Sequence, residues 1–213
     1  RCLGASARTS FAIYLTQGVA LGLVGSLLGV GLGLTLQLDT RDVPINAWSG
    51  VLLSATLLGF GRALGGTSEW YALTLDYRQY VQLFRRGSTL AWQVKYRAAL
   101  GDVPWSELSQ VGTPFDLRAY RWGQYRDKTG LTALVEYRFM LPFAEESLWS
   151  HLGAAAWGGV GALSSSMVPD VRELLPSVGV GLRVELLRRV TVRLDVGFGR
   201  ESRAVYFNFL EAF

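Results

Sequence analysis

The chain has 213 residues, of which half are hydrophobic, 25 are glycine and only 18% are charged, a composition unusual for a soluble domain. A single cysteine and a single histidine exclude a disulfide framework and argue against a histidine/cysteine metal site. The net charge of +4 is small and spread along the chain, so it does not indicate a nucleic-acid-binding protein.

The front of the chain carries a long apolar run. No charged residue occurs from Phe11 to Leu38, and this run exceeds the roughly 20 residues that a membrane-spanning helix needs. Glycines recur through it at spacings that allow close helix packing. We therefore expect an apolar, transmembrane-like helix over residues 1–29.

From Gly31 the pattern changes to alternation of apolar and polar residues, which predicts β-strands. Leu32, Leu34 and Leu36 fall on one face, and Gly33, Thr35 and Gln37 fall on the other. Similar segments follow, some less regular, and the last is expected to run from Val205 to Phe213. Nine strands are expected, starting near residues 31, 49, 70, 89, 130, 149, 177, 190 and 204.

The polar face of these segments carries ionic residues at strand centres, which is typical of a membrane β-barrel with an apolar exterior. Lipid offers no hydrogen bonds, so such a sheet must close on itself or on a partner. A soluble β-sandwich remains the alternative. Aromatic residues near strand ends are expected to form girdles at the membrane interface: Trp48, Trp70, Tyr71, Tyr80, Trp92, Tyr96, Tyr137, Phe139, Tyr206 and Phe207.

One connection, residues 102–128, is long and contains DLRAYRWGQYRD, Asp116 to Asp127. Its arginines and aromatics also occur in nucleic-acid-binding patches, but such a patch does not need two aspartates so close together. A solvated surface loop is the simpler alternative. We favour a loop that folds inward and plugs the interior of a barrel.

Three motifs in order resemble the bacterial surface antigen family, the C-terminal barrel of outer-membrane assembly and translocation proteins. They are GLGLTLQLDTRDVPINAWSG, DLRAYRWGQYRDKTGLTALVEYRF and VGVGLRVELLRRVTVRLDVGFGRESRAVYFNFLEAF. The resemblance implies an outer-membrane β-barrel domain over residues 30–213 of a bacterial protein. It also implies work in protein assembly or translocation, without covalent chemistry and without a cofactor.

The resemblance also implies a set of site residues. The family's inward loop ends in an Arg-Gly-aromatic tip, which Arg118, Ala119 and Tyr120 match except at the glycine. Alanine would be strained there if the position requires positive φ. Gly159 stands where an aspartate of the inner wall is expected. The inner-wall residues that lie within the expected interior, among them the acidic partners of Arg118, are Glu136, Arg138, Arg183, Glu185 and Asp195.

The last strand resembles the insertion signal of outer-membrane barrels, carried here by Phe207, Phe209 and Phe213. Such a strand is also an edge that can pair with another sheet. Alternatively, the three phenylalanines are lipid-facing girdle residues. The expected partners are the outer-membrane bilayer and, at open strand edges, client barrel strands or another copy, with no nucleic acid.

The predicted fold class is all-β: an antiparallel transmembrane β-barrel of 8–9 strands preceded by one apolar helix. Because single-chain bacterial barrels usually have even strand numbers, either eight strands close a small barrel or the chain is the C-terminal part of a larger one. An eight-stranded interior is just filled by side chains, which favours the larger barrel. The N-terminal 30 residues instead resemble a transmembrane segment of ABC-exporter permease subunits, so we expect a fragment or a chimera.

Two further functions remain open: a small structural or pore-forming barrel, and a permease-derived membrane fragment. No catalytic, metal or cofactor residues are predicted. Glu145 and Glu146 lie in an expected turn, His151 lies near a strand start, and the serines lack a G-x-S-x-G elbow. The sequence therefore predicts that the protein is not an enzyme.

Overall fold

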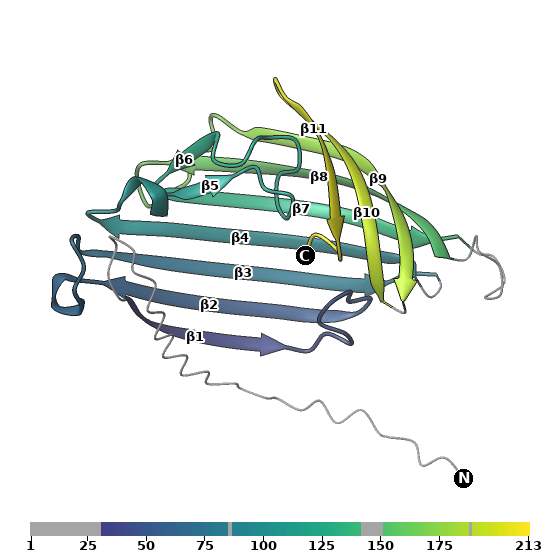
Figure 1. Cartoon of the computed structure of the whole chain (residues 1–213), viewed down its shortest axis with the longest axis horizontal. Coiled ribbons are helices and arrows are strands. Elements are labelled where there is room, and N and C mark those ends of the chain that lie inside the picture. Colours follow the sequence, from purple (N-terminus) through teal and green to yellow (C-terminus); the bar gives the residue numbers. More distant parts are fainter. Residues whose placement is uncertain (1–30, 85–86, 142–150, 188) are drawn as a thin grey trace, which may run out of the picture.

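The structure is a computed structural model and describes residues 31–84, 87–141, 151–187 and 189–213. Its main element is one antiparallel sheet of nine long strands, arranged in the order in which they occur in the chain (Figure 1). These strands are β1 (Gly31–Asp39), β2 (Gly50–Phe60), β3 (Trp70–Gln82), β4 (Thr89–Gly101), β7 (Thr129–Met140), β8 (Leu152–Ser164), β9 (Leu175–Leu187), β10 (Val190–Gly199) and β11 (Arg203–Phe209).

Two short strands, β5 (Ser109–Val111) and β6 (Tyr125–Asp127), pair with each other inside the connection between β4 and β7. The described helices are two three-residue 3-10 turns, η1 (Arg62–Leu64) and η2 (Trp105–Glu107). In the described part of the chain, no helix is long and apolar enough to cross a membrane. The helix expected over residues 1–29 lies outside the described residues.

The all-β class and the nine antiparallel strands agree with the sequence prediction, with corrections at two ends. The last strand stops at Phe209 instead of Phe213. The strand expected from residue 149 is described from Leu152, and it continues four residues beyond the expected end at Val160.

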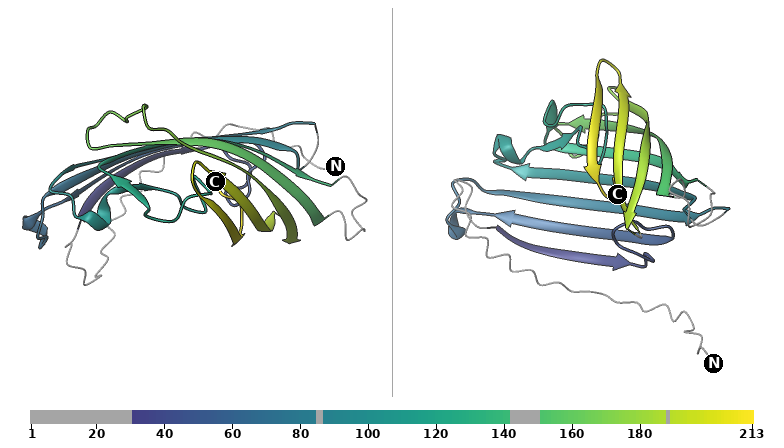
Figure 2. Two further views of the ribbon diagram at one scale, coloured as in Figure 1. Left: turned by 90° about the horizontal axis from the view of Figure 1, so that it is seen from above. Right: turned by 45° about the vertical axis from the view of Figure 1, so that its right-hand side comes forward.

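The sheet is strongly curved, and its two faces differ in chemistry (Figure 2). Large apolar side chains are exposed along alternate positions of one face: Leu32, Leu53, Leu57, Val94, Val135, Val178, Val180, Leu182, Val205 and Phe207. The other face is concave, and it buries charged side chains, including Glu136, Arg183 and Asp195. The alternation in the sequence therefore separates an apolar convex face from an ionic concave face.

In the described part of the chain, β1 pairs with β2 alone and β11 pairs with β10 alone. The nine strands thus form an open sheet with two edges, instead of the small closed barrel that was one of the two expectations. The strands β9 to β11 turn steeply across the direction of β1 to β4 (Figure 1), as the cumulative twist of a large sheet requires.

A contact at one end of the sheet joins segments that lie far apart in the strand order. Arg189, in the β9–β10 turn, donates to Asn46 O at 2.7 Å and to Asp42 Oδ2 at 2.8 Å in the β1–β2 connection. Its guanidinium lies 3.3 Å from the centre of the Trp48 ring. This Arg189 contact draws the two flanks of the curved sheet together at the end where the strands are joined by the β1–β2 and β9–β10 turns.

Several of the aromatic residues expected at membrane girdles occupy the concave face instead. Trp70 is buried and stacks on Phe60, with ring centres 4.1 Å apart. Tyr80 is also buried, and Tyr206 donates to Tyr120 O. Their parity in the strands places them inside, so the girdle prediction was wrong for these three residues.

Candidate functional site: the inward loop and its buried ions

The long connection between β4 and β7 folds against the concave face of the sheet (Figure 2). Asp116 shapes its tip, because Asp116 Oδ1 accepts the backbone N–H groups of Gly112, Thr113 and Leu117 at 3.1, 2.6 and 2.6 Å. Burial raises the pKa of the Asp116 carboxyl above its ordinary value, although these hydrogen bonds oppose the shift. The loop is therefore a compact, internally bonded structure.

Arg118 projects from this tip into the sheet and is fully buried. Its Nη1 donates to Asp195 Oδ2 on β10 at 3.0 Å, and its Nη2 pairs with the Glu136 carboxylate on β7. The guanidinium also lies 3.7 Å from the centre of the Trp157 ring on β8. One side chain of the loop thus forms ion pairs with two strands of the wall and a cation–π contact with a third.

Arg118 is part of a larger group of paired charges, which we call the ion cluster: Arg118, Glu136, Arg138, Arg183, Arg193, Asp195 and Glu211. Arg183 bridges Asp195 at 2.6 Å and Glu211 at 2.9 Å. Arg193 pairs with Asp195 at 2.8 Å, and Arg138 with Glu136 at 2.7 Å. Buried charges are costly unless they are paired, so each member depends on the others.

Glycines on the concave face of the sheet leave space for the inward loop. A Cβ at Gly197 would overlap the carbonyl group of Arg118, and a Cβ at Gly161 would overlap the side chain of Leu117. Ser177 Oγ donates to the Arg118 carbonyl at 2.9 Å in the same place. Gly161 and Gly197 therefore leave room for the loop to lie close against the sheet.

Tyr120 fixes the other side of the tip. Its hydroxyl donates to Pro176 O at 2.6 Å, and its carbonyl accepts the Tyr206 hydroxyl at 2.9 Å. Ala119, between the two anchoring residues, is buried, and it is not among the described residues with positive φ. The strain expected from alanine at the usual glycine position therefore does not arise in this backbone conformation.

The structure shows which of the predicted inner-wall residues contact Arg118. Glu136 and Asp195 contact Arg118, while Arg138 and Arg183 contact the carboxylates of the ion cluster. Glu185 also lies on the concave side, in the pocket beside Arg183 and Glu211, but its carboxylate accepts the backbone N–H of Arg189 at 2.6 Å and is not a partner of Arg118. At Gly159 a Cβ would meet Ala133 O at 2.8 Å, so the expected aspartate would be crowded there.

Sequence reasoning missed Arg193, Glu211 and Trp157 as members or neighbours of the ion cluster. Arg193 alternates with Asp195 on the polar face of β10, a signal that would have placed it in the interior. Trp157 occupies the same face as Gly159, but nothing in the pattern indicates that it lies against an arginine. The sequence pattern placed Glu211 in the last strand, but this strand ends at Phe209.

The segment after β11 turns into the concave side. Leu210 has φ of +64°, and Glu211 beyond it accepts the Thr191 hydroxyl at 3.0 Å as well as Arg183 Nε. Phe213 is buried, and its carbonyl accepts Arg138 Nη2 at 3.1 Å. Phe207 and Phe209 are exposed on the convex face, so the reading of all three phenylalanines as lipid-facing was wrong for Phe213.

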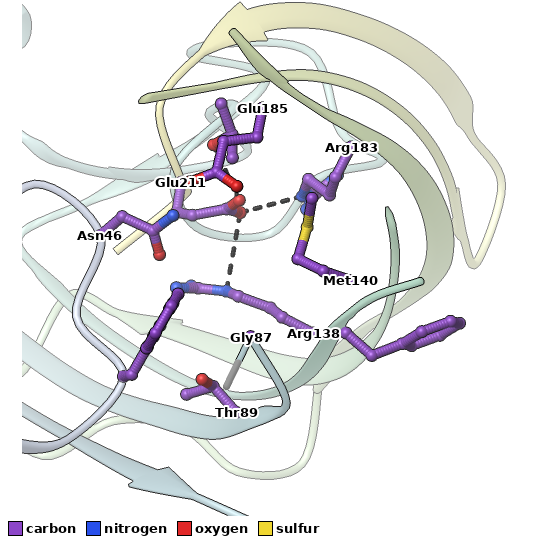
Figure 3. Close-up of a pocket in the computed structure, with 11 residues that line it drawn as sticks. Asn46, Gly87, Thr89, Arg138, Met140, Arg183, Glu185 and Glu211 are labelled. Atoms are coloured by element: carbon purple, nitrogen blue, oxygen red, sulfur yellow. Dashed lines mark hydrogen bonds and ion pairs between the residues drawn. The ribbon is translucent and has the colours of Figure 1, made fainter. Parts of the chain in front are cut away.

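A small pocket lies beside Glu211, where Arg138 and Arg183 converge on its carboxylate (Figure 3). Its volume of about 20 Å³ has room for about one water molecule. Among the described residues, no group of three or more histidine, cysteine or acidic side chains is arranged to hold a metal ion. The arrangement binds the chain's own loop through ion pairs.

Comparison with known protein families assigns the chain to a superfamily. Residues 25–209 match the Omp85 superfamily domain. This match covers most of the chain, so the chain belongs to the Omp85 superfamily, as the resemblance of its three motifs predicted. The proteins of this superfamily are bacterial outer-membrane proteins of assembly and transport. A search of curated proteins found no significant match.

Proposed function

We propose that this chain is part of an outer-membrane β-barrel that assists the assembly or translocation of other proteins. The proposal rests on how the side chains are distributed between the two faces of the sheet, which is the reverse of the arrangement in a soluble protein. Leucine, valine and phenylalanine side chains are exposed on the convex face, whereas the ion cluster is buried on the concave side. Such a sheet suits acyl chains outside and a polar interior.

The two sheet edges supply the proposed activity. An edge strand presents unpaired N–H and C=O groups to any strand that approaches it, and an added strand gains main-chain hydrogen bonds. In this proposal, β1 and β11 receive a strand of a client protein or of another copy, and no covalent bond changes. The ion cluster keeps the inward loop fixed while the edges exchange partners.

One substitution separates edge pairing from folding. Leu210 N donates to Thr191 O and Gly199 N donates to Ser202 O. Because Val205 lies opposite Val196 in the ladder, these bonds direct the N–H of Val205 away from β10. Proline at such a position removes only the outward donor. Val205→Pro is therefore expected to keep the folded sheet but lose client binding at the β11 edge, whereas Val205→Ala retains both.

The measurement is the folding of an unfolded outer-membrane barrel added to liposomes that contain the protein, scored by protease protection. The proposal predicts faster client folding with the original chain and with Val205→Ala than in empty liposomes, and a slower rate with Val205→Pro, in which only the β1 edge is unchanged. Equal client folding with all three chains and with empty liposomes would contradict the assembly role.

The alternative of a pore-forming barrel predicts steady conductance in planar bilayers without any client. The inward loop occupies the concave side and ties into the ion cluster, which does not favour an open pore. The permease-derived alternative depends on residues outside the described part of the chain. Membrane insertion that survives deletion of residues 1–30 removes that alternative.

A further inference from the structure

The connection between β8 and β9, residues 165–174, lies on the opposite side of the sheet from the inward loop (Figure 2, left). Tyr96 points outward from β4, and its hydroxyl donates to Met167 O at 2.7 Å. Register places Tyr96 beside Leu131 of β7, and Leu131 beside Ala162 of β8. The connection therefore folds back over the convex face across these three strands.

Convex-face residues of β4, β7 and β8 are buried at the end of the sheet where the connection lies. Ala98, Thr129 and Ala162 have the parity of the convex face, yet each is only 1% exposed. Farther along the same strands, convex-face residues are open: Val94, Val135 and Val160 are 41%, 46% and 41% exposed. Among the described residues, the connection thus covers the convex face beside Tyr96, while Leu100, nearer the end of β4, stays 41% exposed.

The outer surface of this connection is apolar. Met167, Val168 and Val171 are 51%, 73% and 65% exposed. Asp170, Arg172 and Glu173 stand among them and are also exposed. Large apolar side chains with charged neighbours, at the rim of an apolar face, are typical of segments that lie in a membrane interface.

We infer that residues 165–174 form a membrane-contact segment at this rim of the protein. Met167, Val168 and Val171 enter the acyl-chain boundary of the adjacent leaflet, and the neighbouring charged side chains remain at headgroup level. The occupant is lipid because Met167, Val168 and Val171 lie at the rim of the exposed apolar convex face, beside the hydrogen bond from Tyr96. The inference rests on the proposed membrane position of that face.

The test uses single-cysteine variants of the full chain, in which Cys2→Ser removes the native thiol. Val168→Cys and Val171→Cys probe the segment, Leu182→Cys probes the convex face, and Gln124→Cys probes an exposed position of the inward loop. Each is labelled with an environment-sensitive fluorophore and reconstituted in bilayers. Quenchers are lipids with a nitroxide near the headgroup or deep in the chain, and iodide in water.

The expected result is that the shallow nitroxide reduces the fluorescence at positions 168 and 171 more than the deep nitroxide does. Iodide should have little effect at these positions. Position 182 should respond to lipid nitroxides and position 124 to iodide. If iodide quenches positions 168 and 171 while lipid quenches position 182, the segment lies in water and this inference fails, but the proposed function stands.

Two other outcomes also overturn the inference. Protection of positions 168 and 171 from both iodide and nitroxide lipids would mean that protein covers the segment. Absence of lipid quenching at position 182 would remove the membrane position of the convex face, and the proposed function with it. Two positions in the segment are probed so that the test still gives a result if one of the two substitutions prevents folding.

Discussion

Arg118 is the residue on which the position of the inward loop depends most directly, because it is fully buried and paired with carboxylates of β7 and β10. Arg118→Ala leaves these carboxylates with fewer cations in a dry environment. Breaking a buried ion pair typically costs about 3–5 kcal/mol, and we expect a loss of this size in urea unfolding.

Arg121→Ala is the matched control, since Arg121 is an exposed arginine of the same loop. A surface substitution of this kind is expected to change the free energy of unfolding by less than about 0.5 kcal/mol. If both variants unfold at the same urea concentration as the original chain, the ion cluster does not hold the loop.

Gly197 offers a separate test, because its lack of a side chain lets the Arg118 carbonyl touch the sheet. Gly197→Ala is expected to cost about 1–3 kcal/mol as an overpacked site and to speed tryptic cleavage at Arg121 and Arg126. In Gly158→Ala the new methyl group would have its nearest neighbour at 3.9 Å, so that variant should resist trypsin as the original chain does.

At the residue scale, alternation was enough to place Arg118's two carboxylate partners in the interior, because parity in a strand fixes the face of a side chain. It could not select between Glu136, Glu185 and Asp195, since that choice depends on where the loop tip rests along the strands. Glu211 was beyond prediction because its position follows from the positive φ of Leu210, a conformation that leucine rarely adopts.

At the element scale, the Arg189 contact predicts a pH dependence. Burial acts to raise the pKa of Asp42, but the Trp48 N–H and the Arg189 guanidinium outweigh it, so the net pKa lies below the ordinary 3.8. A depressed folded-state pKa adds stability above the unfolded-state pKa and loses it as pH falls through the folded-state value.

Asp42→Asn keeps an oxygen for the Trp48 N–H but removes the charge that faces Arg189. We expect it to lower the free energy of unfolding at pH 7 by up to about 1 kcal/mol, the range of exposed ion pairs. The difference should shrink as pH falls below 3.8 and through the lowered pKa of Asp42, and it is measured as the midpoint of thermal unfolding of both chains. A difference that persists at low pH would assign the effect to packing.

The long strands were predictable because each spans enough residues for a period of two to be recognised. The strands β5 and β6 were not, since three residues carry too little periodicity. The end of β11 was also misplaced: Phe213 continues an aromatic series in the sequence, although the backbone leaves the sheet at Leu210.

At the scale of the whole molecule, the open sheet predicts how the isolated chain behaves on a gel. A closed barrel resists detergent until heated, and its migration then changes. Because β1 and β11 do not pair with each other in the described part of the chain, the 213-residue chain folded in detergent is expected to migrate identically with and without heating. A heat-dependent shift would show that the edges close in solution.

Closure of the sheet was not accessible from the sequence, because alternation reports the two faces of each strand and carries no information on which edges meet. The curvature of this sheet accumulates from the twist between neighbouring strands, which no single strand's pattern reports. The Arg189 contact likewise joins segments that are more than 140 positions apart, a separation that no local pattern encodes.

The strand order has a consequence for any ring built from this sheet. Every neighbouring pair is antiparallel, so the first and ninth strands point the same way. Joining them to each other would create a parallel seam within an otherwise alternating ladder. A closed ring in which every pair is antiparallel must therefore include an odd number of strands in addition to these nine. Adding a two-stranded hairpin would leave one parallel pair in the ring.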